Sequence, residues 1–424
     1  MPRFCNRRVV DSALRCIFTG AAVITCWQVA SAASAARPKP DSTSRDTVAS
    51  SVLEPAGAPQ MPPYSSSNSF SFAVLGYSAP PAPGLAPPTA VFRIYDDIGV
   101  LHPDMVFDTG NVIWASPGDE QGTQEQLSRF EMFSSNLSIP MYVAPGSKDV
   151  VDEDSDVAFR HTISGGNPWR SFDYGNSHFI VLDSEVPGQA GAISGDQMTW
   201  LQSDLDKSAA STHIFVFVNR CPYAPIPNAP ADSIFTDAGR DAFTALMSKY
   251  KVNSVFSGGL PMYAESVHDG VNYITTGGGG AASTISPADG GFLHFVLVTV
   301  DHGNVSVSPI QPTRIDTRMT PGALGSVTVY NLTDTPLILS RVGILVPSKW
   351  RDKKVGVLGA DRLRVYETQA TALTPDGKKA VDVAPVELDP ANPADPLSRD
   401  FDILYVRVQA PAASAINIKV SPAA

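Results

Sequence analysis

From Phe70 onward, short apolar runs alternate with windows whose apolar residues recur at helical spacing. The window Gln121–Ser135 places Leu127, Phe130 and Phe133 on one face, which predicts an amphipathic helix. Short runs of apolar and β-branched residues bounded by turn-forming residues predict strands. The strands expected in this part of the chain are Phe72–Leu75, Met105–Phe107, Met141–Ala144, Ser171–Tyr174, His178–Asp183, His213–Val218, Val252–Phe256, Asn272–Thr275, Phe292–Val300 and Val305–Ile310.

Two more helices are predicted further along the chain. Ser194 is followed three residues later by Gln197, which is the pattern of a capping box, and Met198 and Leu201 then begin an apolar stripe. A similar stripe predicts a helix over Asp237–Lys251.

The order of these elements predicts two domains. Alternating strands and helices over residues 70–311 indicate a layered α/β sandwich, whose functional site should lie at the loops beyond the strand ends. After Pro312 no helical stripe appears, and short strands between turn residues predict a small all-β sandwich over residues 312–424. The strands expected there are Val327–Tyr330, Leu337–Val346, Arg362–Glu367, Ile403–Val408 and Ile416–Val420.

The N-terminus has the three parts of a secretory signal peptide. Met1–Arg8 carries three arginines, the apolar run that ends at Trp27 is too short to span a bilayer comfortably, and Ala30-Ser31-Ala32 is a small-x-small cleavage site. We therefore expect residues 1–32 to be removed, the protein to be secreted or periplasmic, and no stable membrane span to remain. The alternative is an uncleaved anchor. Residues 33–69 are rich in proline and serine and predict a solvated linker.

The composition narrows the classes of function. The formal net charge is -11, whereas a broad nucleic-acid binding surface is normally basic, so we expect no nucleic-acid partner. Three of the four cysteines lie in the expected signal, which leaves Cys221 and no intramolecular disulfide in the mature chain. A lone cysteine in an apolar setting is more often a buried hydrophobe than a nucleophile.

Five segments resemble, in order, the motifs of the calcineurin-like metallophosphoesterases, including their purple acid phosphatase branch. The segments are Phe72–Tyr77, Thr109–Asn111, Pro145–Asp149, Phe217–Tyr223 and Phe256–Tyr263. The resemblance implies a layered α/β fold over most of the mature chain. It also implies hydrolysis of phosphoric esters by two divalent metal ions, which activate a water and hold the phosphoryl oxygens.

This sequence departs from the family at every position that would supply a charged or imidazole ligand. The residues at those positions are Tyr77, Ala79, Asn111, Ser147, Lys148, Asn219, Gly259 and Pro261. Alanine, glycine and proline offer no donor atom, and an amide oxygen is a poor replacement for a carboxylate or an imidazole. Lys148 adds a cation where like charge opposes the binding of metal ions. The sequence therefore predicts no metal cofactor, with two divalent metal ions as the alternative.

Other charged residues near these motifs leave alternatives open. Asp108, Asp149 and Asp183 are the candidates for displaced ligands. We favour structural roles for them: a turn former at Asp108, a loop cap or an ion pair with Lys148 at Asp149, and a strand-end residue at Asp183. Lys148 and Arg220 would suit a small anion-binding patch, and the alternative that we favour is two solvated cations.

These observations support three hypotheses. The first is an exported pseudoenzyme that binds or scaffolds an unidentified ligand or protein and does not catalyse hydrolysis. The second is a metal-dependent phosphomonoesterase or phosphodiesterase that uses displaced ligands. The third is a structural envelope protein whose pocket binds nothing.

Overall fold

The computed structural model describes residues 68–319, 324–347, 349, 368–373, 383–389 and 401–422. The expected signal peptide, nearly all of the expected linker and the expected strand Arg362–Glu367 lie outside the described residues. The first strand begins at Ser69, so the last residue of the expected linker belongs to it. No helix in the described ranges is long and apolar enough to cross a membrane.

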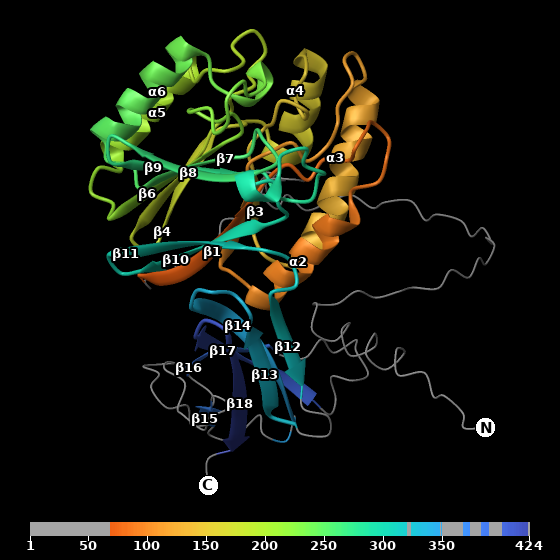
Figure 1. The fold of residues 1–424 in the computed structure, drawn as a ribbon, viewed down its shortest axis with the longest axis vertical. Helices are drawn as coiled ribbons and strands as arrows, with labels where there is room; N and C mark the ends of the chain where they lie inside the picture. Colours follow the sequence, from red (N-terminus) through yellow and green to blue (C-terminus); the bar gives the residue numbers. More distant parts are fainter. Residues whose placement is uncertain are drawn as a thin grey trace, which may run out of the picture.

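Two mixed β-sheets form the centre of the α/β domain (Figure 1). The first sheet has the order β11-β10-β1-β2-β3, with β1, β2 and β3 parallel. The second has the order β4-β5-β6-β7-β9-β8, with β5, β6, β7 and β9 parallel. The first sheet contains β1 (Ser69–Leu75), β2 (Met105–Asp108), β3 (Met141–Val143), β10 (Phe295–Asp301) and β11 (Asn304–Ile310). The second contains β4 (Arg170–Tyr174), β5 (Ser177–Val181), β6 (His213–Val218), β7 (Ser254–Ser257), β8 (Tyr263–His268) and β9 (Val271–Thr276).

The alternation of side chains along the strands separates two cores. On β1, Phe72 and Val74 face the second sheet, whereas Ala73 and Leu75 face the opposite side. Aromatic rings fill the space between the sheets, and the rings of Phe107 and Phe217 stack with centroids 3.7 Å apart. This aromatic core fixes the two sheets face to face, so their strand ends meet at one edge.

Helices cover the outer faces of both sheets (Figure 1). Helices α5 and α6 bury Leu201 and Phe243 against the second sheet, and α2 buries Ile94 and Ile98 against the first. The helices are α2 (Thr89–Leu101), α3 (Glu120–Ser134), α4 (Glu153–Phe159), α5 (Gly195–Lys207) and α6 (Asp237–Lys249), with the short turns η1 (Ser135–Leu137), η2 (Arg160–Ser164), η3 (Ala231–Ser233) and η4 (Pro287–Asp289).

The capping box predicted at Ser194 is wrong. Ser194 is the N-cap of α5, but its side chain makes no capping hydrogen bond and donates instead to Gln189. The side chain of Gln197 is held by Asp183, because its Nε2 donates to the Asp183 carbonyl and its Oε1 accepts from the Asp183 N–H, both at 2.8 Å. The helix was predicted correctly, but its first turn is fixed by tertiary contacts.

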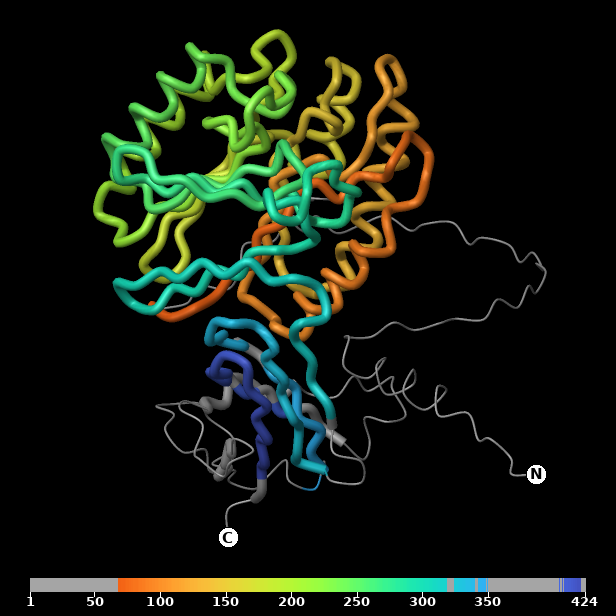
Figure 2. The backbone as a smooth tube through the Cα atoms, in the orientation of Figure 1, coloured from red at the N-terminus to blue at the C-terminus, as the bar shows by residue number. Residues whose placement is uncertain are grey.

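After Ile310 the described chain passes once into a β-sandwich (Figure 2). One sheet has the order β12-β13-β18-β15 and the other β14-β17-β16. An α/β sandwich followed by an all-β sandwich confirms the predicted fold class. The strands are β12 (Ile315–Met319), β13 (Ser326–Asn331), β14 (Leu337–Pro347), β15 (Thr368–Leu373), β16 (Val383–Asp389), β17 (Phe401–Ala410) and β18 (Ser414–Pro422).

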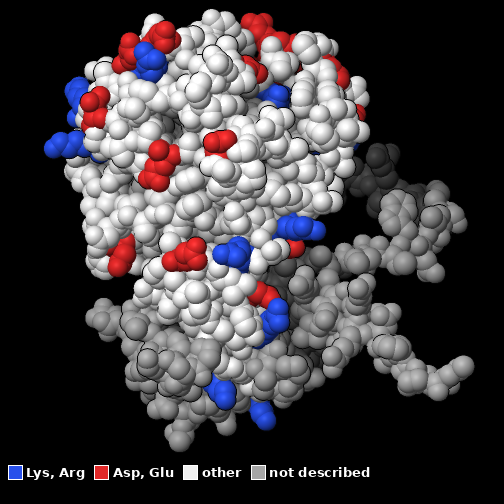
Figure 3. Space-filling model, viewed as in Figure 1, with Lys and Arg blue, Asp and Glu red and all other residues white. Residues whose placement is uncertain are grey.

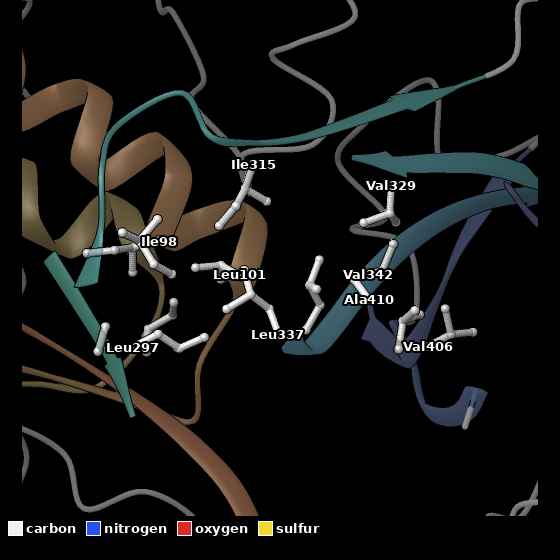
Figure 4. Close-up of a cluster of buried hydrophobic side chains, with 14 of the residues drawn as sticks. Ile98, Leu101, Leu297, Ile315, Val329, Leu337, Val342, Val406 and Ala410 are labelled. Carbon is white, nitrogen blue, oxygen red and sulfur yellow. The ribbon is translucent and has the colours of Figure 1, made fainter. Parts of the chain in front are cut away.

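One hydrophobic core continues from the α/β domain into the β-sandwich. Figure 4 shows Ile98 and Leu101 of α2 on one side and Leu337 and Val342 of β14 on the other, with Ile315 beside them. All five side chains are at most 3% exposed. The two domains therefore bury a common apolar surface, and α2 is the element that joins them.

Candidate functional site

The predicted positions lie in loops that follow parallel strands of both sheets. The loop after β2 contacts the loops after β1 and β7 through Thr109. A Cβ atom placed on Gly76 or on Gly258 would lie 2.1 Å from Thr109 Oγ1, so only glycine permits these close approaches. Asn219, which follows β6, donates from Nδ2 to the Thr109 carbonyl at 2.7 Å. The two sheets are thus joined tightly at this edge.

Asp149 organises the backbone of two loops. Its carboxylate accepts hydrogen bonds from four backbone N–H groups, at distances of 2.7–2.9 Å. The donors are Asn111, Val112, Ile113 and Gly146. Burial raises the pKa of this fully buried carboxyl to about 7, although the four hydrogen bonds act in the opposite direction. Asp149 is therefore a loop cap, and no ion pair joins it to Lys148 in the described structure.

Both asparagines at predicted ligand positions are engaged with backbone N–H groups. Asn111 Oδ1 accepts from the Lys148 N–H at 2.9 Å, and Asn219 Oδ1 accepts from the Ser147 N–H at 3.3 Å. Both asparagines are fully buried. Asn111 Nδ2 has no hydrogen-bond partner in the described structure. These bonds bring four of the predicted positions together as one backbone-binding network.

The first motif contributes its backbone to the same network. The N–H of Tyr77 donates to the Gly110 carbonyl at 2.9 Å, and the N–H of Ala79 donates to the Asn111 carbonyl at 2.8 Å. Burial raises the pKa of the Tyr77 hydroxyl to about 12, with a smaller contribution from Asp232. The phenol is therefore neutral and does not supply a negatively charged oxygen at physiological pH.

The last two predicted positions, Gly259 and Pro261, offer no donor atom, and at Gly259 there is no space for one. A Cβ atom on Gly259 would lie 2.5 Å from the Ser233 carbonyl oxygen and 3.1 Å from Ser233 Cα. Backbone of η3 therefore occupies the space that a side chain at this position would need. Pro261 lies two residues further, beside Gly277, and no described contact joins it to the asparagine network.

Lys148 rests on two aromatic rings. Its Nζ lies 4.0 Å from the ring centroid of Trp114 and 5.7 Å from that of Tyr77, which are cation–π distances. The backbone of Trp114 is held by Gln126, which accepts from its N–H at 3.3 Å and donates to its carbonyl at 3.1 Å. Sequence reasoning missed Trp114, and its place just after the second motif was the only signal.

Arg220 is not the solvated cation that we expected. Its Nε and Nη2 donate to both carboxylate oxygens of Glu185 at 2.6–3.1 Å, and its Nη1 donates to the Ala231 carbonyl at 3.0 Å. Glu185 is 3% exposed and Arg220 is 9% exposed. An anion would have to displace Glu185 to reach this guanidinium. The sequence analysis did not single out Glu185.

The remaining acidic candidates are also structural. Asp108 Oδ1 accepts from the Gly110 N–H at 2.9 Å, and Asp183 Oδ1 accepts from the Glu185 N–H at 2.7 Å. Both carboxyls are fully buried. Burial raises the pKa of Asp108 well above its usual range and that of Asp183 to about 7.

These residues do not fit a centre of two divalent metal ions. The amide oxygens of Asn111 and Asn219 accept backbone hydrogen bonds, and position 259 has no room for a side chain. Among the described residues, no group of three or more His, Cys, Asp or Glu side chains is placed to hold a metal ion. Carboxylates and imidazoles are the ligands that such a centre requires, and they do not converge here.

Comparisons with known proteins give matches only among solved structures. No family model and no curated protein matches the sequence. A purple acid phosphatase from seeds of yellow lupin (Lupinus luteus) matches with a TM-score of 0.48 and 18% identity, covering 59% of this chain and 53% of the enzyme. This chain spans about half the length of the lupin enzyme.

Two further structures show the range of the likeness. GAP50, described as the anchor in the inner membrane complex of Plasmodium, has a TM-score of 0.45 and 12% identity, covering 58% of this chain and 85% of GAP50. A dimetal phosphatase from Danio rerio has a TM-score of 0.43 and 12% identity, covering 57% of this chain and 99% of the enzyme. At such identities the likeness concerns the fold alone.

Proposed function

We propose that this protein is an exported metallophosphoesterase-like protein that works without metal ions, by binding or scaffolding rather than by hydrolysis. The observation that carries the proposal is the hydrogen bonding at the predicted ligand positions. Asn111 and Asn219 hold loop backbone, and the backbone of Ser233 excludes a side chain at position 259. Export rests on the N-terminal sequence of residues 1–32.

Metal content and turnover, measured on the same preparation, test this proposal. The protein is incubated with manganese or zinc and desalted. Bound metal is then counted, and hydrolysis of a phosphomonoester and a phosphodiester is followed. We expect substoichiometric metal and no turnover above buffer. Two bound ions per chain, with turnover that is lost in Asp149→Ala while circular dichroism stays unchanged, would establish a phosphohydrolase with displaced ligands instead.

We also propose that the binding role includes an oxyanion at Lys148. Its ammonium lies over the rings of Trp114 and Tyr77 and forms no ion pair in the described structure. Its N–H donates to Oδ1 of the buried Asn111, whose Nδ2 has no partner among the described residues. An ammonium group forms charge-assisted hydrogen bonds with carboxylate and phosphate oxygens. Because Lys148 would act as a single cation without a metal ion, we expect it to bind such an oxyanion weakly. The ligands that this position suits are therefore oxyanions that one ammonium group accommodates.

A thermal-shift screen in EDTA tests the oxyanion proposal. Phosphate and carboxylates are titrated against the wild-type protein, Lys148→Met and the control Lys207→Met, whose lysine ends the exposed side of α5. We expect a saturable shift that Lys148→Met abolishes and Lys207→Met retains. The absence of any saturable shift would favour the structural protein whose pocket binds nothing.

A further inference from the structure

Between β11 and β12 the chain crosses α2 and is fixed there by one side chain. Asp97 Oδ2 of α2 accepts a hydrogen bond from the Thr313 N–H at 2.6 Å. Asp97 is only 6% exposed. Thr313 has a φ of 68°, in the left-handed region that β-branched residues rarely adopt. The contact therefore holds a strained residue at the point where the two domains join.

Like charges surround the Asp97 carboxyl group. Burial is the main cause that raises the pKa of Asp97, and the hydrogen bond from Thr313 lowers it. Asp96 of α2 and Asp316 of β12 raise the pKa further, because they carry like charge. The pKa of Asp97 is raised to about 7. No ion pair with Asp97 exists among the described residues. Asp316 is itself paired with Arg318, whose Nε lies 2.8 Å from its Oδ2. Other charged residues described on α2 or beside the elements packed against it are Arg93 and Arg314.

The core contacts described across the interface are apolar and carry no titratable group. Leu101 and Leu337 pack across it, and Ile315 follows the linker directly (Figure 4). These contacts keep the domains associated whatever the charge on Asp97. The polar contact at Thr313 is thus the part of the junction that responds to pH.

We propose that Asp97 makes the attachment of the linker to α2 at Thr313 depend on pH. Its carboxyl group is buried without an ion pair among the described residues, so its neutral form is compatible with the closed linker and its ionised form loosens it. When the linker opens, water reaches Asp97 and the carboxyl returns to ordinary acidity. The closed junction therefore binds the proton more tightly than the open one. The stability that proton binding adds to the closed junction is complete below about pH 4 and is lost as the pH rises through about 7.

Amide hydrogen exchange in the full chain tests this inference at the linker itself. Protection of the Thr313 amide, corrected for intrinsic exchange, is measured near pH 5 and near pH 8.5. For the wild-type protein we expect protection to fall by about tenfold or more between these values, since a shift of one pKa unit corresponds to tenfold. The Val106 amide, which donates to the Pro140 carbonyl in the first sheet, is the internal control and should not change in this way.

Two substitutions at Asp97 should affect the protection of the Thr313 amide differently. Asp97→Asn keeps an acceptor oxygen without a charge, so Thr313 protection should become independent of pH. Asp97→Ala removes the acceptor, and protection should be low at both values. If Asp97→Ala does not fold, the asparagine variant decides alone. The same fall in protection in Asp97→Asn as in the wild-type protein would overturn the inference.

Discussion

At the scale of single residues, the site is defined by side chains that hold backbone. Asp149 caps four N–H groups, and Asn111 and Asn219 each accept one more. Buried polar side chains are usually hydrogen-bonded, and the bonds that these three side chains accept give them a structural role in the loops. The same positions would need free acceptor atoms to bind a metal ion.

The Glu185–Arg220 pair should be the most sensitive single contact near the site. Glu185→Ala leaves a buried guanidinium without its partner, and breaking a buried pair in this way costs roughly 3–5 kcal/mol of unfolding free energy. Urea denaturation measures the loss. Arg129→Ala, which breaks the exposed pair with Glu125, is the control and should leave the urea midpoint unchanged. Equal effects of both substitutions would contradict the expectation.

At the scale of elements, His178 ties the β4–β5 hairpin to α5. Its Nδ1 lies 2.7 Å from Asp173 Oδ1 and its Nε2 lies 2.9 Å from Asp204 Oδ2. Burial lowers the pKa of this imidazole, but the two carboxylates outweigh burial and raise it above its usual value. The ring donates to both acids only when it is protonated.

This arrangement predicts a pH dependence with a definite sign. The folded-state pKa of His178 is raised, so its contribution to stability is complete below about pH 6.5 and is lost as the pH rises through the folded-state value. The unfolding free energy should therefore fall between pH 6 and pH 9, and it should fall less in His178→Gln. Denaturant titrations across this range give the comparison. An equal fall in both proteins would mean that other groups control it.

Elements with a strong pattern could be predicted from the sequence, and those without a start signal could not. The apolar spacing of α2 is present in Val91, Ile94, Ile98 and Leu101, but its N-cap is Pro88, which makes no side-chain capping bond. The proline-rich run before it indicates a loop instead. Strand β8 was missed because it lies at a sheet edge, where its residues are half-buried or exposed and show no apolar pattern.

The sequence predicted that the motif positions would lie together at one edge of the sheets, because they follow strands with a clear pattern. It did not predict the side-chain contacts that they make there. Strands that end in glycine loops placed Asn111, Lys148 and Asn219 at one edge. The partners that decide what these loops can do, such as Trp114 for Lys148, come from other parts of the chain. Periodicity carries no information on such pairs, because they depend on which strands lie side by side and on how the loops after them fold.

At the scale of the whole molecule, the continuous core makes the two domains energetically dependent on each other. On the face drawn in Figure 3, Lys and Arg are interspersed with Asp and Glu, and most of the described surface carries neither. The contacts that join the domains along α2 and β14 are apolar. We expect the domains to unfold together.

Leu337→Ala tests this dependence. Leu337 is 2% exposed and packs between α2 and the sandwich, so its truncation should cost about 2–5 kcal/mol of unfolding free energy. The loss should appear equally in probes of either domain, such as amide exchange in β6 and in β18. Leu332→Ala, at a site that is 49% exposed, should change little. Destabilisation confined to β18 would show that the domains unfold separately.

The close approach of Ser233 to Gly259 also sets a limit on protein engineering. An imidazole cannot be introduced at position 259 by side-chain exchange alone, because a main-chain carbonyl stands 2.5 Å from the first atom that would be added. A redesign that needs a side chain at position 259 must first remodel the segment Ala231–Ser233, whose Ala231 carbonyl accepts a hydrogen bond from Arg220. Directed evolution by point substitutions would therefore not place a metal-binding side chain at position 259 unless the main chain of this segment also moved.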